Sequence, residues 1–358
     1  GIVTMGDNFI IDEKKEKLIN RISDFLNNEY TDVQLKNKYG LGKNYPKWIN
    51  DNKAEISKIE KKATVISFRP FDNRFTVFDN KLLWRWRYEV MSQIINKDNL
   101  SLLVTKAHRD SSFAHSFITN KISEAIYLSS KSGSNAMNLP LYLYPEEDSS
   151  ARIPNLDPKI AADIAKAIGL RFTNEKEDTA GTFAPIDVLD YIYAVLHSPT
   201  YRETYKEFLK IDFPRVPYPS DAVTFWQLVT LGGELRQIHL LESPKLATQI
   251  KELSLGYPIA GDNSVTRKMI KASVGFEPDE VDSSIGKVWL NDTQYFTNVP
   301  LVAWEFYIGG YQPAQKWLKD RRERTLDHHD IKHYMNIIAS LSLTNDLMQQ
   351  IDNINVVD

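Results

Sequence analysis

The chain has 358 residues, of which 42% are hydrophobic and 25% are charged, with a formal net charge of -3 and no cysteine. This is an ordinary globular composition for one or two domains, and the lack of cysteine excludes disulfide frameworks, thiolate metal sites and cysteine nucleophiles. No apolar run approaches the roughly 20 residues of a membrane span and no secretory leader is visible, so we expect a cytoplasmic protein without a membrane partner.

The chain starts with Gly1, which indicates a segment of a longer protein, and its first 62 residues are expected to hold helices and a linker. Hydrophobic residues recur at helical spacing within residues 12–29, at Leu18, Ile22, Phe25 and Leu26. This spacing predicts a helix. Residues 36–62 are rich in lysine and interrupted by glycine and proline, which predicts a loop followed by a short helix over residues 54–59.

From residue 63 the pattern changes to short segments rich in β-branched and aromatic residues, repeated every 10–15 residues. Such a rhythm is typical of a meander or mixed sheet. The expected strands cover residues 63–68, 74–79, 100–107, 115–120, 124–130 and 139–145. A helix over residues 84–95 is expected to interrupt them.

After residue 145 the pattern is mainly helical. The expected helices cover residues 156–170, capped by Asp157 with Pro158 in the first turn, then 185–197, 199–210 and 221–242. The last of these is expected to break or bend near Gly232 and Gly233. Residues 211–221 predict an extended connector, and residues 287–291 and 294–299 predict a short β excursion.

The last predicted element is a long helix that begins after Asp327. Its apolar residues recur every three or four positions, at Ile331, Tyr334, Ile338, Leu341 and Met348, which indicates core packing. The expected fold class is therefore α+β. A mixed, mainly antiparallel N-terminal sheet with flanking helices precedes a mainly helical C-terminal half that ends in this helix.

Motifs for catalysis or metal binding are largely missing. His329 and His333 flank Asp330 at a spacing that resembles a zinc-protease motif, but that motif requires a glutamate, and Asp330 suits the first turn of a helix. The phosphate-binding loop, the nucleophile elbow and the adenine methyltransferase tetrapeptide do not occur in the sequence. We expect no catalytic residue and no metal ligand in this chain.

Positive charge is concentrated in one segment. Residues 61–121 carry eleven lysines and arginines against five acidic residues, whereas residues 146–358 carry twenty-two against thirty-one. Within the basic segment, residues 67–91 read SFRPFDNRFTVFDNKLLWRWRYEVM, with four arginines and seven aromatic residues. This asymmetry favours a surface for a polyanion, with a solvated charged face as the alternative.

Several sequence blocks resemble a known family. They are the 67–91 stretch, LLVTK at 102–106, SFAHSFITNKI at 112–122, NLPLYLYP at 138–145, the tyrosine-rich segment 191–219 and WEFYIGGYQPAQKWLKDR at 304–321. In this order they resemble the C-terminal specificity domain of Type ISP restriction-modification enzymes, and the opening GIVTMGDNF resembles the segment that leaves an adenine methyltransferase core.

The resemblance implies that the chain reads double-stranded DNA for a longer enzyme, with the methyltransferase domain of the same polypeptide as its partner. S-adenosylmethionine, ATP and magnesium are then expected only in upstream domains, and no cofactor is expected in this chain. The expected organisation is a linker with helices over residues 1–62, a DNA-reading subdomain over 63–150 and a mainly helical subdomain over 151–358.

Arginine and lysine are the side chains that most often read guanine or contact phosphate. The expected DNA-binding residues are Arg85, Arg87, Lys106, Arg109, Ser112, Lys121, Lys131, Lys316, Lys319, Arg321 and Arg322. The turn from Lys106 to Ser112 is the first choice for base contacts because strand-connecting loops often carry function. Arg69 and Arg74 are instead expected to pair with Asp72, and His115 is expected to be structural.

Two other functions stay open at this stage. The first is an enzyme that uses paired carboxylates on a sugar or another small substrate, which would need an acidic cleft with a raised carboxyl pKa in the helical half. The second is a structural docking domain. A basic concave strip would favour DNA over both.

Overall fold

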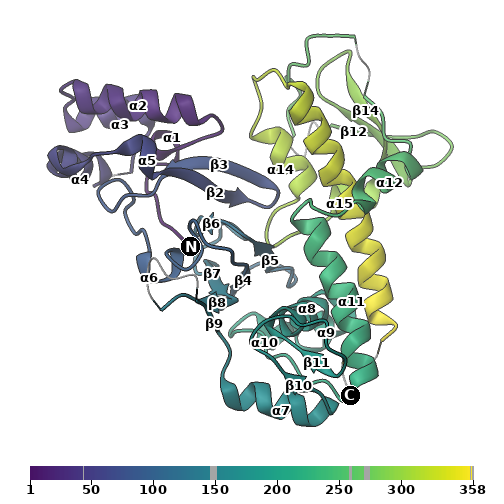
Figure 1. Cartoon of the computed structure of the whole chain (residues 1–358). Helices are drawn as coiled ribbons and strands as arrows, with labels where there is room; N and C mark the ends of the chain where they lie inside the picture. The colour runs from purple at the N-terminus through teal and green to yellow at the C-terminus, as the bar shows by residue number, and fades with distance from the viewer. Residues whose placement is uncertain (43, 146–150, 258–259, 270–274, 355, 357–358) are drawn as a thin grey trace.

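The computed structural model describes the chain except for residues 43, 146–150, 258–259, 270–274, 355 and 357–358. Three lobes surround a small central sheet (Figure 1). The N-terminal lobe lies at one side, the helices between residues 158 and 209 lie below the sheet, and the segment from residue 276 to 319 lies at the opposite side from the N-terminal lobe. The mixture of helices and small sheets confirms the α+β class.

Short helices pack against one face of a four-stranded sheet in the N-terminal lobe. The helices are α1 (Asp7–Ile10), α2 (Lys15–Asn27), α3 (Asp32–Tyr39), α4 (Tyr45–Asn52), η1 (Lys53–Glu55) and α5 (Ile59–Lys62). The strands are β1 (Ile11–Asp12), β3 (Asp72–Val77), β2 (Ala63–Arg69) and β6 (Ile122–Ser123), in that spatial order. Strand β2 pairs antiparallel with β3 and parallel with β6.

The loop predicted after residue 36 is wrong, because glycine and proline mark helix ends there. Helix α3 starts with a capping box between Thr31 and Gln34, and it stops at Gly40, which has a φ of 63°. Pro46 lies in the first turn of α4, where its missing N–H costs no hydrogen bond.

Two elements predicted in the basic segment and just after it are also wrong. Only Tyr88–Met91 (α6) is helical in the region where a helix over 84–95 was expected, and Arg87 before it has a φ of 52°. Residues 124–130 form turns instead of a strand. Tyr127 and Leu128 in this segment are buried in the C-terminal core, so their apolar character comes from tertiary packing.

The central sheet has the order β5 (Ser116–Thr119), β4 (Ser101–Thr105), β7 (Ala136–Pro140), with antiparallel pairing throughout. Every residue of β4 is buried, because its two faces serve different cores. Successive side chains of a strand point to opposite faces. Leu102 and Val104 pack with the lower helices, whereas Leu103 packs with the C-terminal lobe.

The lower lobe is built mainly from α8 and α11. Its elements are α7 (Pro158–Ile168), β10 (Arg171–Phe172), β11 (Thr182–Phe183), α8 (Pro185–His197), α9 (Pro199–Thr204), α10 (Lys206–Leu209) and α11 (Ala222–His239), and β8 (Tyr142–Leu143) and β9 (Ile153–Pro154) precede them. Helix α12 (Lys245–Glu252) follows α11 and lies beside the C-terminal lobe (Figure 1). Asp157 caps α7, as predicted. Residues 211–219 form no helix or strand, in agreement with the predicted connector.

A break in α11 at its two glycines, one of the two alternatives predicted there, is wrong, because the helix is continuous from Ala222 to His239. A Cβ atom on Gly232 would lie 1.8 Å from the carbonyl oxygen of Asp190 in α8. Gly232 therefore permits a close crossing of two helices.

The C-terminal lobe contains β12 (Phe276–Pro278), β13 (Ile285–Trp289), β14 (Tyr295–Pro300), α13 (Leu301–Glu305), α14 (Pro313–Lys319) and α15 (His328–Asp352). The 25-residue helix α15 starts at Asp327 with the predicted cap and runs past both the C-terminal lobe and α11 (Figure 1). Its apolar stripe is core, as predicted: Tyr334, Ile338 and Leu341 are buried. No helix within the described residues is long and apolar enough to cross a membrane.

The tip of the β2–β3 hairpin joins the N-terminal lobe to the rest of the molecule. Phe71, with a φ of 62°, lies at this tip and is 4% exposed. Its ring packs edge-on against Phe117 of the central sheet at 5.2 Å and faces His239 of α11 at 6.0 Å. His333 of α15 donates a hydrogen bond of 2.8 Å to the Phe71 carbonyl oxygen.

Candidate nucleic-acid interface

The turn chosen from the sequence for base contacts is a loop between β4 and β5, as predicted. Lys106, Arg109 and Ser112 are exposed on it. The carboxylate of Asp110 holds the loop from inside: it contacts His115 Nε2 at 2.8 Å, Ser129 Oγ at 2.9 Å and Lys131 Nζ at 2.7 Å. The loop therefore presents exposed donors on a fixed backbone.

Lys131 was expected to contact a DNA phosphate, but its main partner in the structure is the carboxylate of Asp110. Its ammonium group pairs with Asp110 and also donates to the carbonyl oxygen of Arg109 at 3.2 Å. Lys131 is half-exposed, so its first role is to brace the loop that carries Arg109.

Two histidines form the buried side of the same loop. The rings of His108 and His115 stack at 4.4 Å, and both side chains are buried. Burial, together with the neighbouring His108, lowers the pKa of His115 to about 4. His115 is therefore neutral at physiological pH and structural, as expected from the sequence.

Asp110, His108 and His115 offer ligand atoms within 4.8 Å of one another, as do Asp327, His329 and Asp330. In the second group the carboxylates of Asp327 and Asp330 complete the capping box of α15. In the first group, the hydrogen bonds and the ion pair of Asp110 with its three side-chain partners explain the position of its carboxylate without a metal ion.

Arg85 and Arg87 lie beside the end of the central sheet where this loop begins. Arg85 and Val3 exchange two backbone hydrogen bonds of 3.0 Å, and the next residue back, Ile2, accepts one from Ala125 at 2.8 Å. Ala125 in turn accepts one of 2.7 Å from Ala136, which pairs with Thr105 at the end of β4. One continuous hydrogen-bonded row thus connects the two basic segments.

The aromatic rings around these arginines are packed, while the arginines are exposed. Trp86 stacks on Tyr88 at 4.8 Å and lies 5.2 Å from Phe78. Arg85 and Arg87 are exposed, and in the described part of the chain neither forms an ion pair. The rings of the stretch 67–91 are explained by packing, and its two exposed arginines are available to a ligand.

Arg69 and Arg74 are internal, as expected, and only Arg69 has a different partner from the predicted Asp72. Arg74 makes two hydrogen bonds to Asp72, at 2.8 and 3.1 Å. Arg69 instead pairs with Glu124 at 2.8 Å. Burial raises the pKa of Glu124 to about 7, and Arg69 opposes this rise.

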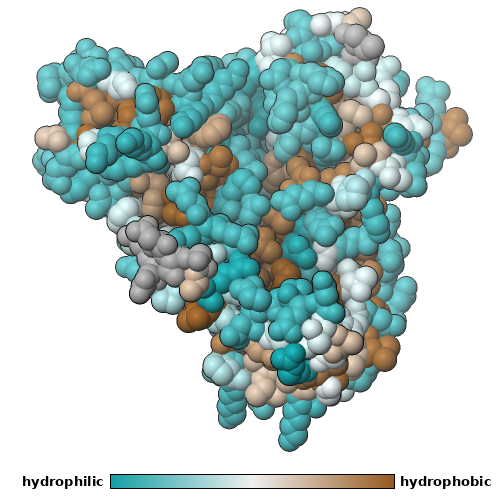
Figure 2. Space-filling view, viewed as in Figure 1, coloured by the Kyte–Doolittle hydropathy of each residue, from teal (hydrophilic) through white to brown (hydrophobic). Residues whose placement is uncertain are grey.

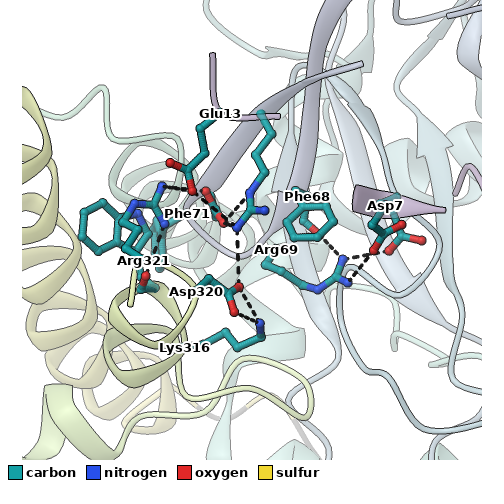
Figure 3. Close-up of polar contacts among 12 residues, drawn as sticks. Asp7, Glu13, Phe68, Arg69, Phe71, Lys316, Asp320 and Arg321 are labelled. Atoms are coloured by element: carbon teal, nitrogen blue, oxygen red, sulfur yellow. Dashed lines mark hydrogen bonds and ion pairs between the residues drawn. The ribbon is translucent and has the colours of Figure 1, made fainter. Parts of the chain in front are cut away.

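Arg321 and Lys316 were expected to contact DNA, but they belong to this internal network (Figure 3). Arg321 is 6% exposed, pairs with Asp72 at 2.9 Å and lies over the ring of Trp317 at 3.7 Å. Lys316 pairs with Asp320, and burial lowers its pKa. The buried carboxylate of Asp72 requires compensating cations. The prediction that Arg321 and Lys316 contact DNA is therefore wrong, and neither residue belongs to the candidate DNA interface.

Residues of this network line a polar hollow between the N-terminal and C-terminal lobes, where Figure 2 shows hydrophilic residues. Its volume is about 440 Å³. The cations Arg21, Arg69, Arg74, Lys316 and Arg324 line it together with the carboxylates Asp7, Asp12, Glu13 and Asp320. These charges largely neutralise one another, so the hollow is not a basic strip.

The remaining expected residues are separate from the loop. Lys319 and Arg322 are exposed near the end of α14. Lys121 is partly buried, which lowers its pKa, and it lines a small recess with Asn120 and His239. The interface supported by the geometry therefore centres on Arg85, Arg87, Lys106, Arg109 and Ser112.

Two buried carboxylates of the helical half, Asp187 and Asp190 on α8, have internal partners. Burial raises the pKa of Asp190, and its carboxylate is bound by Arg236 at 2.7 and 2.9 Å. Asp187 is bound by Lys176 at 2.7 and 2.8 Å. These pairs connect α8 to its neighbours, and they do not form the acidic cleft that a paired-carboxylate enzyme requires.

Arg202 is a candidate functional residue that was not predicted from the sequence. It lies in a groove beside Ser112, and the spacing of Arg202, Lys206 and Lys210 by four residues could have indicated a basic helix face.

Comparison with known proteins gives one family and a consistent fold. A family model described as the Type ISP C-terminal specificity domain matches residues 1–350. No curated protein sequence matches the chain.

Three solved structures share the fold. The ATP-dependent Type ISP restriction-modification enzyme LlaBIII bound to DNA is 16% identical with a TM-score of 0.72, and the match covers 100% of this chain and 23% of that one. A DrdV–DNA complex is 17% identical with a TM-score of 0.72, over 100% and 35%. A nuclease-deletion mutant of the Type ISP enzyme LlaGI with a DNA substrate mimic is 17% identical with a TM-score of 0.66, over 98% and 27%. The chain thus spans about a quarter to a third of these proteins.

Proposed function

Because this chain belongs to the family of Type ISP C-terminal specificity domains, we propose that it recognises a sequence in double-stranded DNA for a longer restriction-modification enzyme. The observation that carries the proposal is the family match over residues 1–350. The DNA-bound state of the three similar structures supports it.

Arg85, Arg87, Lys106 and Arg109 are the proposed contacts. They are exposed cations without ion pairs among the described residues, which distinguishes them from the cations of the inter-lobe hollow. Arginine can make two hydrogen bonds to guanine in the major groove. Arg109 is the proposed base reader because the Asp110 contacts fix the backbone beside it.

The proposed division of labour gives this chain no catalytic step. DNA methylation and cleavage would belong to other domains of the longer enzyme, together with any S-adenosylmethionine, ATP and magnesium. The proposed partners are double-stranded DNA and a methyltransferase domain of the same polypeptide. We propose a cytoplasmic location, where such an enzyme meets DNA.

Selection from a pool of duplexes with a randomised segment tests the proposal. The chain should enrich a common sequence, because specific readers bind their site far more tightly than other DNA. Arg109→Ala should reduce discrimination at one position of that sequence by about 1–3 kcal/mol. Lys332→Ala, an exposed cation on α15, is the control. Enrichment of no sequence by the chain would contradict sequence recognition.

A further inference from the structure

A groove of about 620 Å³ lies directly beneath the loop that carries Arg109. Its walls come from that loop, from α9 and α10, and from the segment after α13, and they include Ser111, Ser112, Lys206, Lys210 and Tyr307. The backbone N–H of His108 donates to the carbonyl oxygen of Lys210 at 3.3 Å, which attaches the loop to the end of α10.

Arg202 lines this groove from α9. Its Nε donates to the carbonyl oxygen of Leu196 at 2.7 Å, near the C-terminus of α8, and its guanidinium lies 5.9 Å from the ring of Phe113. Within the described residues no carboxylate forms an ion pair with it. Glu203 and Glu207, which also line the groove, pair with Lys206 and Lys210 instead.

Arg202 is half-buried, and a guanidinium that loses part of its hydration without gaining a counter-charge is unusual, because buried charges are normally paired. Burial lowers the pKa of Arg202 to about 10. Its charge also adds to the effect of burial in lowering the pKa of His239 to about 3. By contrast, Arg69, Arg74, Arg236 and Arg321 all have carboxylate partners.

We propose that Arg202 forms the floor of an anion site that binds a phosphate group, and that a backbone phosphate occupies it when DNA is bound. The occupation of this site by a DNA phosphate rests on the proposed function. The hydrogen bond to Leu196 uses only Nε, so the terminal amino groups are the donors for the phosphate oxygens. Ser111 and Ser112, both exposed at the groove, supply further donors from the same loop as Arg109.

In this arrangement the groove helps to fix the position of the β4–β5 loop along the DNA duplex. Phosphate contacts fix the position of a protein on the duplex, and base contacts then read the sequence. A phosphate held at Arg202 would align the β4–β5 loop with one nucleotide, because the loop is attached at two points. His108 donates to the carbonyl oxygen of Lys210 at the end of α10, and the N–H of Gly309 donates to the carbonyl oxygen of Ala114 in the loop at 2.6 Å.

The test uses Arg202→Gln, with Arg171→Gln as a control, since Arg171 is exposed on β10 outside the groove. The first measurement is the melting temperature in inorganic phosphate against chloride at equal ionic strength. Phosphate at about ten times its dissociation constant should raise the melting temperature of the wild type by roughly 2 °C. The rise should persist in Arg171→Gln and vanish in Arg202→Gln. Without phosphate, Arg202→Gln should melt no lower than the wild type, because it removes an unpaired charge.

The second measurement is the dependence of duplex affinity on salt. Loss of one phosphate contact should reduce the slope of log affinity against log salt by about one unit. An equal phosphate effect on all three proteins would overturn the anion site. A lost phosphate effect with an unchanged slope would overturn the DNA phosphate as its occupant. The effect of Arg109→Ala on sequence discrimination does not depend on Arg202. If that effect is observed, the proposed function holds even where the phosphate measurements overturn the anion site or its DNA occupant.

Discussion

Removal of the Arg321 side chain should destabilise the fold and leave DNA contacts intact. The Arg321–Asp72 pair joins two lobes, with side chains 7% and 2% exposed. Breaking a buried ion pair by removing one partner costs roughly 3–5 kcal/mol. Asp72 keeps its two hydrogen bonds to Arg74, which limits the loss, but the contact with Trp317 at 3.7 Å is lost as well. We therefore expect Arg321→Ala to lower the free energy of unfolding by about 3 kcal/mol.

Urea unfolding followed by tryptophan fluorescence measures this change. Arg322→Ala is the matched control, because Arg322 is the adjacent residue and is exposed, so its effect should be below about 0.5 kcal/mol. Folded Arg321→Ala at low temperature should bind duplex DNA as the wild type does. A stability loss below about 1 kcal/mol, or a loss of DNA affinity as large as that of Arg109→Ala, would refute the assignment of Arg321 to the inter-lobe network.

Three further outcomes follow from the packing. Gly232→Ala should destabilise the protein by about 1–3 kcal/mol, measured by thermal unfolding, because the new methyl group would meet the Asp190 carbonyl; an increase in stability, as helix propensity alone would give, would contradict this. Phe71→Ala should cost about 3–5 kcal/mol, and equal stability would show that the hairpin tip does not join the lobes. The free energy of unfolding should fall as pH drops from about 6.5 to about 4, because His115 stays neutral in the folded state, with its pKa at about 4, while it gains a proton in the unfolded state. His115→Gln should flatten this part of the pH profile, and an unchanged profile would contradict the neutral, buried histidine.

Local signals in the sequence predicted most of the regular structure correctly. Asp157 and Asp327 identify helix starts because a capping side chain acts within three residues. The same local patterns failed where tertiary packing decides. Trp84 to Tyr88 resemble a helical segment, but the hydrogen bonds between Arg85 and Val3 hold part of it as an isolated bridge.

The candidate site was predictable only in part, for the same reason. The exposed loop residues follow from strand spacing, so Lys106, Arg109 and Ser112 could be found. The partner of Arg321 could not, because Asp72 lies 249 positions away, and an arginine that is free looks the same in a sequence as one that is paired. Arg202 was missed because its lack of a carboxylate partner among the described residues is visible only in three dimensions.

The salt dependence of duplex binding tests the central claim most directly. The claim is that Arg85, Arg87, Lys106 and Arg109 together face the DNA. Changing all four to alanine should reduce the slope of log affinity against log salt by about 2.7 units, if Arg85, Arg87 and Lys106 each contact a phosphate while Arg109 reads a base. The same number of charges removed at Lys159, Lys166, Lys251 and Lys332, which are exposed elsewhere, should leave the slope close to that of the wild type. Equal slopes for the wild type and both variants would contradict the claim.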